Sequence, residues 1–588
     1  MTDSDSGMIR KLFYRTLPVQ ILLIAITSLN SIIDGTLASN LIGSDAMAVI
    51  GLFAPIDMAF NTINAVMLGG SQILCGRFMG KNQLDHTKSI FSLDLLVILI
   101  LSIIGMLLCL LIPGALGAIF STPSDLRTAF SDFARGRAFG LPAQMLATQL
   151  TSFLQLEQQE KRTYIGIGVM LISNFILDIL FVKTLEMGMF GLALATSVSY
   201  LLYFVFLALY YFSGKAVIRF SLSSIVPSKL KDIVRIGCPG AISQGCQVLR
   251  GVLINYLIIK YIGPDGMAAY SVMTGTFGGF FFAAANGVSN ATRLLASVYT
   301  GEEDRTGLKT IVRTAVFRGT FIVAAASLIF IVLCTPLTNL FYHDAASAVY
   351  KMTRMGFILF PLSAPFSVIY LIFINVHQCF DREKLAGFLA VVDGVAGMGL
   401  AAVILTPILR MTGIWMAQII NGIFTTAILF GYAWIKLKHF PKDLEDLEVL
   451  PEGFGVGEED RMDLTVHSME DVMRTSERIT GFCREHGISP KRTMYASLSM
   501  EEMAKNIVEH GFAADKKAHS ADVRVLIKDG DLILRLKDDC KPFNPKEFAE
   551  MFKPEDVTHN VGIRLISAAA SEFTYQNTLG LNVLTIKI

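Results

Sequence analysis

The chain has 588 residues, of which 53% are hydrophobic, and its mean hydropathy is +0.54. This average excludes an ordinary soluble protein and assigns most of the chain to a lipid bilayer. The net charge of +1 gives no indication of a nucleic-acid partner, and we expect none.

The charged residues are concentrated at the C-terminal end. Of the 99 Asp, Glu, Lys and Arg residues, 47 lie within 437–588, where they make up about 31% of the positions, against about 12% before. This contrast indicates two solvents and therefore two domains. The eight cysteines form no C-x-x-C pair and lie mostly in apolar runs, which predicts buried thiols rather than a disulfide framework or a zinc site.

Twelve apolar runs are long enough to span a bilayer, which takes about 20 residues. They lie near 16–38, 47–76, 90–112, 132–155, 163–184, 190–212, 233–259, 267–297, 311–334, 349–376, 386–406 and 413–435. Basic residues gather in one set of alternate loops, whereas "ASNLIGSDA" and "CTPLTNLFYHDAAS" of the other set have none. The positive-inside rule then predicts a multi-pass protein of the cell membrane with both termini in the cytoplasm.

A faint internal repeat divides the spans into two sets of six. "EMGMFGLALATSVSYLL" is similar to "RMTGIWMAQIINGIFTT", and aligning Gly191 with Gly413 gives an offset of 222 residues. Two related bundles with a binding site between them are typical of secondary transporters.

Polar residues inside the apolar runs are candidates for a transport site, because burying them in lipid is costly. The first run contains Asn30 and Asp34, the fifth contains Asn174 and Asp178 one helical turn apart, and the sixth contains Thr196. Carboxylate, amide and hydroxyl oxygens suit a hard cation or a proton. The alternative is a hydrogen-bonded pair that joins two helices. For five other ionisable residues near the spans a structural role is at least as good an interpretation: Asp57, Asp94, Arg250, His377 and Asp393.

Three stretches resemble the multidrug and toxic compound extrusion (MATE) transporters, and the resemblance covers roughly 10–436: "IIDGTLASNLIGSDAMAVIGLFAPI", "GGSQILCGRFMGKNQLDHTKSIFS" and "SNFILDILFVKTLEMGMFGLALATSVSY". The resemblance implies export of drugs and organic cations in exchange for sodium ions or protons. It also implies that Asp34, Asn174, Asp178 and Thr196 form a cation site in the N-lobe. Some members carry acidic residues in the seventh and tenth spans, where this chain has Gln247 and Ser367. Coupling through the N-lobe is therefore favoured.

The C-terminal part, after a charged linker over 437–462, has the pattern of an α+β domain. We expect a strand at "DLTV", helices near 468–486 and 490–512, and a hairpin in "ADVRVLIKDGDLILRLKDD" with Asp-Gly at its turn. A further helix is expected after Pro545, followed by strands at "EFTYQ" and "NVLTIKI". Glu502, Asn506 and His510 recur every four residues and are expected on one helical face.

The order "EEMAKNIVEHG", "DDCKPFNP", "HNVGIRLI" resembles the GHKL ATP-binding fold of histidine kinases, gyrase and the anti-sigma-factor serine kinases. The resemblance implies that Asn506 holds Mg²⁺ on the ATP phosphates, Glu502 is a general base, Asp538 binds adenine and Gly562 lies in the phosphate lid. The family's Asp-x-Gly is Asp538-Asp539-Cys540 here, and this departure puts ATP affinity in doubt. The alternative is a degenerate binding module without ATP.

Together these patterns predict an all-α polytopic membrane domain over 1–436, with twelve transmembrane helices in two six-helix lobes at about 10–213 and 214–436. A cytoplasmic GHKL sandwich is predicted over 463–588. The favoured function is cation-coupled efflux of drugs with a regulatory or kinase-like ATP-binding domain. A histidine kinase would need a phosphoacceptor hairpin before this domain, and 437–462 has no room for one. The domain therefore looks more like the anti-sigma-factor serine kinases. An alternative is a membrane-anchored serine kinase that acts on a cytoplasmic protein and uses the transporter part as a sensor. An ATP-driven pump is disfavoured, because the chain contains no G-x-x-x-x-G-K-[ST] motif.

Overall fold

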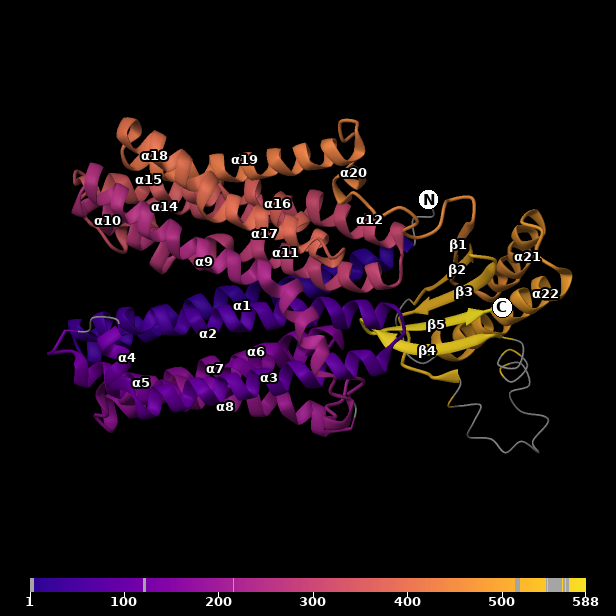
Figure 1. The fold of residues 1–588 in the computed structure, drawn as a ribbon, viewed down its shortest axis with the longest axis horizontal. Coiled ribbons are helices and arrows are strands. Elements are labelled where there is room, and N and C mark those ends of the chain that lie inside the picture. The colour runs from indigo at the N-terminus through magenta and orange to yellow at the C-terminus, as the bar shows by residue number, and fades with distance from the viewer. Residues whose placement is uncertain are drawn as a thin grey trace.

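The computed structural model describes residues 5–119, 123–214, 216–512, 519–545, 547, 563, 566 and 570–588. The helix expected after Pro545 and the lid residue Gly562 therefore lie outside the described residues, apart from isolated positions of that helix. The described chain consists of a long helical part and a smaller part at one end that contains the β-sheet (Figure 1).

The first lobe of the helical part is formed by α1 to α8. Their bounds are α1 Asp5–Leu41, α2 Ser44–Gly80, α3 Leu84–Leu111, α4 Pro113–Ile119, α5 Arg127–Ala138, α6 Leu141–Leu156, α7 Glu160–Asp178 and α8 Gly188–Phe212. A π-helical segment, η1 (Ile179–Thr184), follows α7 directly.

The second lobe, described over 216–437, follows two short 3₁₀ turns, η2 (Leu222–Ser224) and η3 (Pro227–Lys229). Its helices are α9 Leu230–Tyr261, α10 Pro264–Ser271, α11 Gly278–Gly301, α12 Arg305–Arg313, α13 Thr320–Val332, α14 Cys334–Asn339, α15 Ala348–Leu362, α16 Ala364–Cys379, α17 Glu383–Val391, α18 Gly397–Leu409 and α19 Met411–Leu437. Three π-helical segments join neighbouring helices: η4 Val272–Thr276, η5 Thr314–Gly319 and η6 Val392–Ala396.

Within the described ranges, ten helices are long and apolar enough to cross a membrane, or eleven if the bent pair of Pro264–Thr276 and Gly278–Gly301 is counted as one span. The remaining predicted span, 132–155, corresponds to two shorter helices, α5 and α6. They are separated at Phe139 and Gly140, where a Cβ on Gly140 would lie 2.5 Å from the Cα of Ser197. This segment packs tightly on α8 and is interrupted where a single helix was expected.

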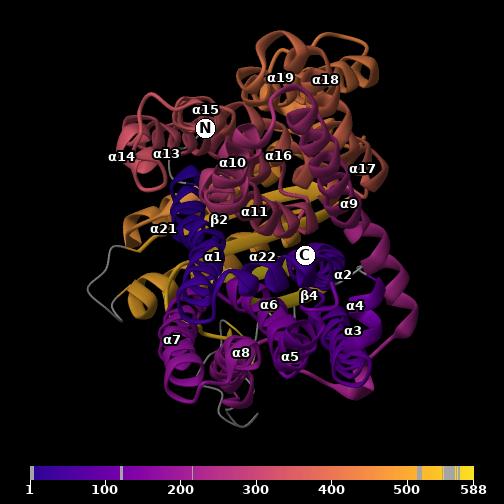
Figure 2. The ribbon, with the colours of Figure 1, turned by 90° about the vertical axis from the view of Figure 1, so that its left-hand side faces the viewer.

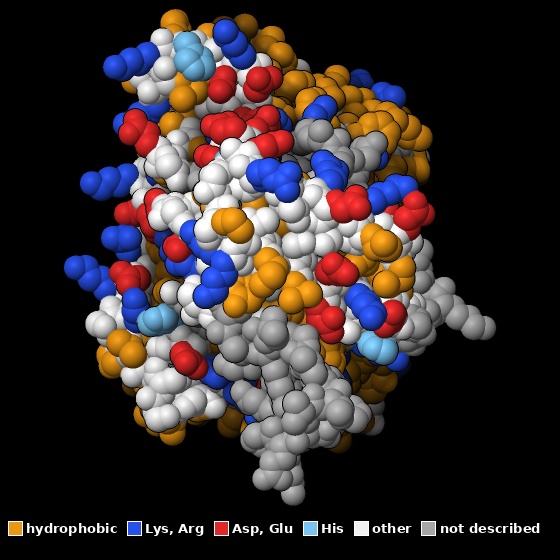
Figure 3. All heavy atoms as spheres, turned by 90° about the vertical axis from the view of Figure 1, so that its right-hand side faces the viewer, with side chains coloured by type: hydrophobic (Ala, Val, Ile, Leu, Met, Phe, Trp, Pro, Cys, Tyr) orange, Lys and Arg blue, Asp and Glu red, His pale blue; other side chains and the backbone are white. Residues whose placement is uncertain are grey.

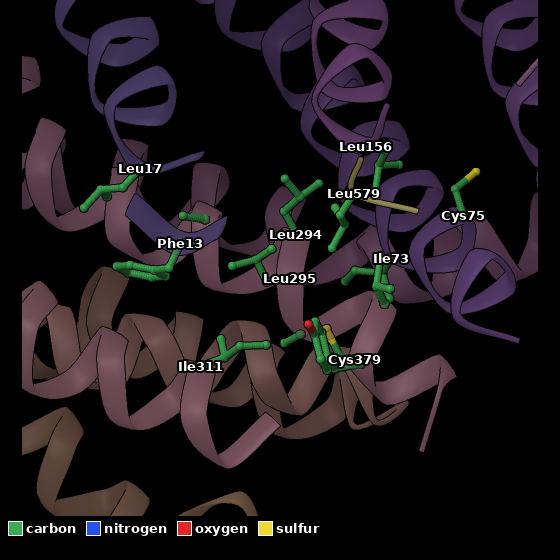
Figure 4. Close-up of a cluster of buried hydrophobic side chains, with 14 of the residues drawn as sticks. Phe13, Leu17, Ile73, Cys75, Leu156, Leu294, Leu295, Ile311, Cys379 and Leu579 are labelled. Carbon is green, nitrogen blue, oxygen red and sulfur yellow. The ribbon is translucent and has the colours of Figure 1, made fainter. Parts of the chain in front are cut away.

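The two lobes are joined at the end that carries the sheet. One buried cluster there combines side chains of both lobes: Phe13 and Leu17 of α1, Leu294 and Leu295 of α11, and Ile311 of α12 are among its members (Figure 4). At the opposite end the lobes have separate cores, one around Phe53 and Phe130 and one around Phe357 and Trp415. The helical part is therefore closed at the sheet end.

Glycines allow the helices of the two lobes to approach one another at this closed end. A Cβ on Gly70 of α2 would lie 1.9 Å from the backbone oxygen of Ile233 in α9, and one on Gly80 would lie 2.1 Å from that of Val298 in α11. Neither position can accept a side chain without moving backbone. Small residues are the usual means by which membrane helices approach closely.

The C-terminal domain is a five-stranded antiparallel sheet in the order β1-β2-β3-β5-β4, with two helices on one face. Its elements are β1 Arg461–Val466, α21 Met469–Glu485, α22 Pro490–Asn506, the π-helical η7 Ile507–Gly511, β2 Ala521–Lys528, β3 Asp531–Asp538, β4 Glu572–Thr578 and β5 Leu581–Lys587. The expected strands and hairpin are present. Positive φ angles at Asp529 and Gly530, 53° and 84°, fit the tight turn of the predicted Asp-Gly.

Alternation along the strands gives the sheet two different faces. Leu532, Leu534 and Leu536 point toward α21 and α22 and belong to the core of this domain. Arg535 and Lys537, between them in sequence, point to the other face and contact the membrane part. The sheet is therefore a layer between its own helices and the two lobes, behind whose junction it lies in the end view (Figure 2).

The segment predicted as a linker lies against the second lobe. Its helix α20 (Leu444–Glu448) has Leu447 in the shared core, and Arg382 donates to the backbone oxygen of Glu448 at 2.9 Å. Glu448 is 1% exposed, and its carboxyl oxygens find no hydrogen-bond partner in the described part of the chain. Burial, with a contribution from Glu445, raises the pKa of Glu448 to about 8.

We predict that Glu448 makes the docking of this segment sensitive to pH. Its pKa in the folded chain lies above the ordinary 4.5, so its contribution to stability is fully present below about pH 4.5 and is lost as the pH rises through about 8. Glu448→Gln should remove this loss, on the order of a few kcal/mol, and give a thermal midpoint that falls less between about pH 5 and about pH 9.

The matched control is Glu452→Gln, at an exposed glutamate of the same segment, which should keep the wild-type pH profile. Equal pH profiles for Glu448→Gln and the wild type would contradict the prediction.

Candidate functional site

Three of the four residues predicted for the N-lobe cation site meet between α1, α7 and α8. The hydroxyl of Thr196 in α8 donates to Oδ2 of Asp34 in α1 at 3.5 Å, and Nδ2 of Asn30 donates to the same oxygen at 3.1 Å. Asp178 at the end of α7 is close enough to Asp34 for the two carboxyl groups to affect each other electrostatically. Asn174 lies one turn before Asp178 in α7, so that both amide and carboxyl face the same way.

This group of residues has unused hydrogen-bonding capacity. Asn174 and Asp178 are 1% and 0% exposed. Among the residues that the structure describes, neither side chain has a partner at hydrogen-bonding distance and angle. Buried polar atoms are normally paired, and exceptions call for an ion, a water or a proton. Oxygens from two carboxylates, an amide and a hydroxyl are the donor set that a hard cation or a proton requires.

The helix changes its geometry at this point. Asp178 is the last α-helical residue of α7, and the π-helical η1 begins at Ile179. Single π turns inside helices occur frequently at functional sites. The π-helical segment thus begins directly after one of the predicted site residues.

A basic residue that was not selected from the sequence adjoins the carboxylates. Arg137, at the end of α5, is 7% exposed and donates to Oδ1 of Asp57 and to Oε1 of Gln144, both at 3.0 Å. It also acts electrostatically on Asp34. The signal for it was available, because Arg137 lies inside the apolar run 132–155. Its partner Asp57, 80 positions away, could not be identified without the fold.

The corresponding part of the second lobe has different chemistry. Gln247 is exposed and reaches Ser243 at 3.5 Å, while the buried Ser367 donates to the backbone of its own helix at 3.1 Å. Asp393, in η6, accepts hydrogen bonds from Tyr370 and, at 2.8 Å, from Asn421. These bonds join three helical segments, as expected of a structural role.

The remaining ionisable residues singled out from the sequence lie elsewhere. Asp94 is fully buried in α3, and its oxygens have no hydrogen-bond partner within the described ranges. His377 is buried beside Arg382 at 3.2 Å, outside the N-lobe group. Arg250 is half-buried in α9.

The candidate nucleotide site lies in the C-terminal domain, between α22 and β3. Glu502 and Asn506 are half-buried and one turn apart on α22, as predicted. His510 departs from this spacing, because the chain turns from α to π geometry at Ile507. The predicted helix over 490–512 is thus an α-helix to Asn506 that ends in a single π segment.

Asp538 is held at the end of β3. It is 5% exposed, and its Oδ1 accepts from Nδ2 of Asn582 at 2.7 Å and from the backbone N–H of Cys540 at 3.0 Å. Burial raises the pKa of Asp538. Asn582 in turn accepts from the hydroxyl of Tyr575 at 2.8 Å, and burial raises the pKa of Tyr575 to about 12. The sequence did not single out Asn582 or Tyr575.

Cys540 stands where the resemblance to the GHKL fold predicts a glycine. Its side chain is 7% exposed, and a Cβ on Gly511 of η7 would lie 3.0 Å from its sulfur. The thiol therefore fills space between β3 and the end of the α22 segment. Asp538 and Asn506, the residues predicted to bind adenine and a phosphate-bound Mg²⁺, are among the described residues, and Gly562, predicted for the lid, is not.

Asp539, the neighbour of Asp538 in sequence, contacts the membrane part. Its carboxylate accepts from Nζ of Lys11 in α1 at 2.8 Å and faces Nδ1 of His519 at 2.9 Å. Burial would raise the pKa of Asp539, but the bonds from Lys11 and His519 hold it below its ordinary value.

The closed end of the helical part carries ion pairs that join the lobes. Arg77, in the last turn of α2, donates to both carboxylate oxygens of Asp381 at 2.7 and 2.9 Å, and Asp381 follows α16 in the other lobe. Two parallel bonds from one guanidinium make a geometrically specific pair. The pairing of these two residues was not predicted from the sequence, because they are 304 positions apart.

Comparisons with known proteins match both parts of the chain. A family model of MatE proteins matches residues 20–184 and again 239–403, and a model of the histidine kinase-like ATPase domain matches 466–588. The two MatE matches start 219 residues apart, close to the offset of 222 predicted from the sequence repeat.

Among curated proteins, multidrug export protein MepA of Staphylococcus saprophyticus is 22% identical over 381 residues, or 63% of this chain and 82% of that protein. Probable multidrug resistance protein YoeA of Bacillus subtilis is 22% identical over 289 residues, or 47% of this chain and 61% of that protein.

Solved structures agree in fold. A MATE structure in complex with MaL6 superposes with a TM-score of 0.67 at 19% identity, covering 73% of this chain and 96% of that one. An outward-facing multidrug resistance MATE family transporter of the MOP superfamily gives 0.66 with the same identity and coverage.

Proposed function

This chain belongs to the MatE family of membrane transporters, and we propose that it exports small-molecule drugs or organic cations in exchange for sodium ions or protons. The observation that carries the coupling part of this proposal is the pair of Asp34 and Asp178 with its unsatisfied buried oxygens. Such a pair is stable with a proton or a cation between its members and unfavourable without one.

A transport cycle follows from these groups. With a proton or cation at Asp34 and Asp178, the pair carries less negative charge, and its burial between α1, α7 and α8 costs less. When the ion leaves, like charges adjoin one another, and Arg137 is the neighbouring cation that can compensate them. Competition between the ion and a cationic substrate for this charge would couple their movements in opposite directions.

We further propose that the end bearing the C-terminal domain faces the cytoplasm. Basic residues of the predicted inside loops lie at that end, among them Lys11, Arg15 and Arg77, which contact Asp539, Glu160 and Asp381. The positive-inside rule favours this orientation.

For the C-terminal domain we propose binding of Mg-ATP, with Asn506 as metal ligand and Asp538 at the adenine edge, and a regulatory role toward the transporter. A second candidate, a protein serine kinase acting on a cytoplasmic protein, is favoured by Glu502, which lies one turn before Asn506 on the same helix where a general base is expected. Transfer of labelled phosphate from ATP to serine of a co-purified protein would distinguish the second candidate from the first.

The transport proposal predicts that Asp34→Asn and Asp178→Asn each reduce gradient-driven efflux to the level of empty vesicles. The amide keeps the shape of the carboxyl group but can neither carry the proton nor supply the charge. Substrate efflux is measured in proteoliposomes under an imposed sodium or proton gradient.

The control is Asp85→Asn, at an aspartate on α3 whose side chain is 98% exposed, which should transport at the wild-type rate. Wild-type efflux in both site variants, with normal yield and a monodisperse elution profile, would place ion coupling elsewhere.

A second prediction concerns nucleotide binding by the full chain. Asn506→Ala should abolish Mg²⁺-dependent ATP binding in calorimetry, and Lys505→Ala, at the exposed neighbour of Asn506, should not. Cys540→Gly should tighten binding about 5- to 150-fold, equivalent to about 1–3 kcal/mol, if the thiol overpacks the pocket. Unchanged binding in both Asn506→Ala and Cys540→Gly would show that this pocket does not hold ATP.

A further inference from the structure

The face of the C-terminal sheet that points away from α21 and α22 is bound to the second lobe by four ion pairs. The loop between α11 and α12 presents Glu302, Glu303 and Asp304 to this face. Nζ of Lys537 lies 2.5 Å from Oε2 of Glu302, and Arg535 lies 3.7 Å from the same oxygen. The other pairs are Lys528 with Glu303 and Arg524 with Asp304.

Most of these charges are buried by the contact. The side chains of Glu302 and Asp304 are 3% and 2% exposed, and those of Lys537 and Arg524 are 10% exposed. Burial alone would raise the pKa of Asp304, but Arg524 and Lys537 hold it well below its ordinary value. Exposed pairs contribute little, whereas breaking a buried pair leaves a charge without compensation. The buried ion pairs therefore stabilise this one position of the domain against the second lobe.

The same sheet also contacts the first lobe. Gln576 of β4 donates to the backbone oxygen of Met79 at the end of α2. Leu579, in the turn between β4 and β5, belongs to the same buried cluster as Leu156 of α6 and Ile73 of α2, and it lies beside them in Figure 4. The neighbouring Gly580 abuts Gln158, where an added Cβ would lie 2.2 Å from the amide oxygen.

One rigid layer thus bridges both lobes at the end where the lobes themselves meet. At this end the lobes also contact each other directly, through Arg77 with Asp381 and through Gly70 with Ile233. If the lobes separate at this end, the sheet must leave one of them, because it cannot stay seated on both. Leaving the second lobe exposes buried charges, and leaving the first exposes Leu579.

We propose that the C-terminal domain is a lock, which holds the transporter closed on its own side and must release one lobe in each transport cycle. A further bond between the domain and the first lobe, from Lys11 to Asp539, adjoins Asp538 of the candidate nucleotide site in sequence. The inference rests on the proposed transport activity but not on ATP binding. On the opposite end of the molecule from the membrane part's separate cores, the described surface carries scattered basic, acidic and hydrophobic side chains (Figure 3).

The test is efflux by full-length chains in proteoliposomes with a charge reversal in the lock. Lys537→Glu places a like charge against Glu302 and should raise the initial efflux rate severalfold. The double variant Glu302→Lys with Lys537→Glu restores this pair with reversed polarity but leaves Arg535 facing a like charge, so it should return the rate part of the way toward the wild-type value. Arg524→Gln, which leaves Asp304 without its guanidinium, is a second releasing variant should Lys537→Glu fail to fold.

The matched control is Lys491→Glu, at an exposed lysine of α22 on the far side of the sheet, which should leave the rate unchanged. Wild-type rates in every folded releasing variant, or no restoration in the double variant, would overturn the lock. Absence of efflux from the wild type and from all variants would instead overturn the transport proposal. A silent wild type with active Lys537→Glu would support both.

Discussion

The buried apolar cluster at one end of the membrane part is the constraint on which the remaining structure depends. It contains Leu294 of the second lobe, Leu156 of the first and Leu579 of the C-terminal sheet. Part of this apolar surface would be exposed if any one of the three parts were absent. The closed junction of the lobes and the docking of the sheet are therefore aspects of a single packed region, and neither can change without the other.

The candidate ion site lies beyond this region, toward the end where each lobe has its own core. Asp34 is near the end of α1 that is remote from Lys11, and Asp178 closes α7 on the same side. A site near separate cores and remote from a shared one is the arrangement that alternating access requires, because movement of one lobe against the other changes which end is open. The lock would set the free energy of that movement without touching the carboxylates.

Local patterns predicted much of this architecture. Apolar runs located the long helices, the spacing of Asn174 and Asp178 placed both on one face, and Asp529-Gly530 fixed the turn between β2 and β3. Each of these depends on residues close in sequence. The break at Gly140 was missed, although Gly140 and Pro142 are a local signal for the end of one helix and the start of the next. The π turn after Asn506, which moves His510 off the predicted face, was missed as well.

The contacts that join distant segments could not be predicted in the same way. Alternation in "LILRLKD" places Arg535 and Lys537 on one face of the sheet, but it does not reveal that Glu302, 235 positions before Lys537, lies opposite. The same holds for Asp538 with Asn582 and for Arg137 with Asp57. The fold supplies these partners, and they turn two separately recognisable parts into one coupled structure.

The most direct measurement is the distance between the lobes at the closed end, by pulsed electron paramagnetic resonance. Spin labels at Lys81→Cys and Lys384→Cys, both exposed and one on each lobe, are introduced after Cys238→Ser removes the exposed native thiol. The account predicts one short distance in the otherwise unchanged chain and an added population of longer distances when Lys537→Glu is combined with the labels. Identical distributions in the two proteins would contradict the claim that the docked sheet holds the lobes together.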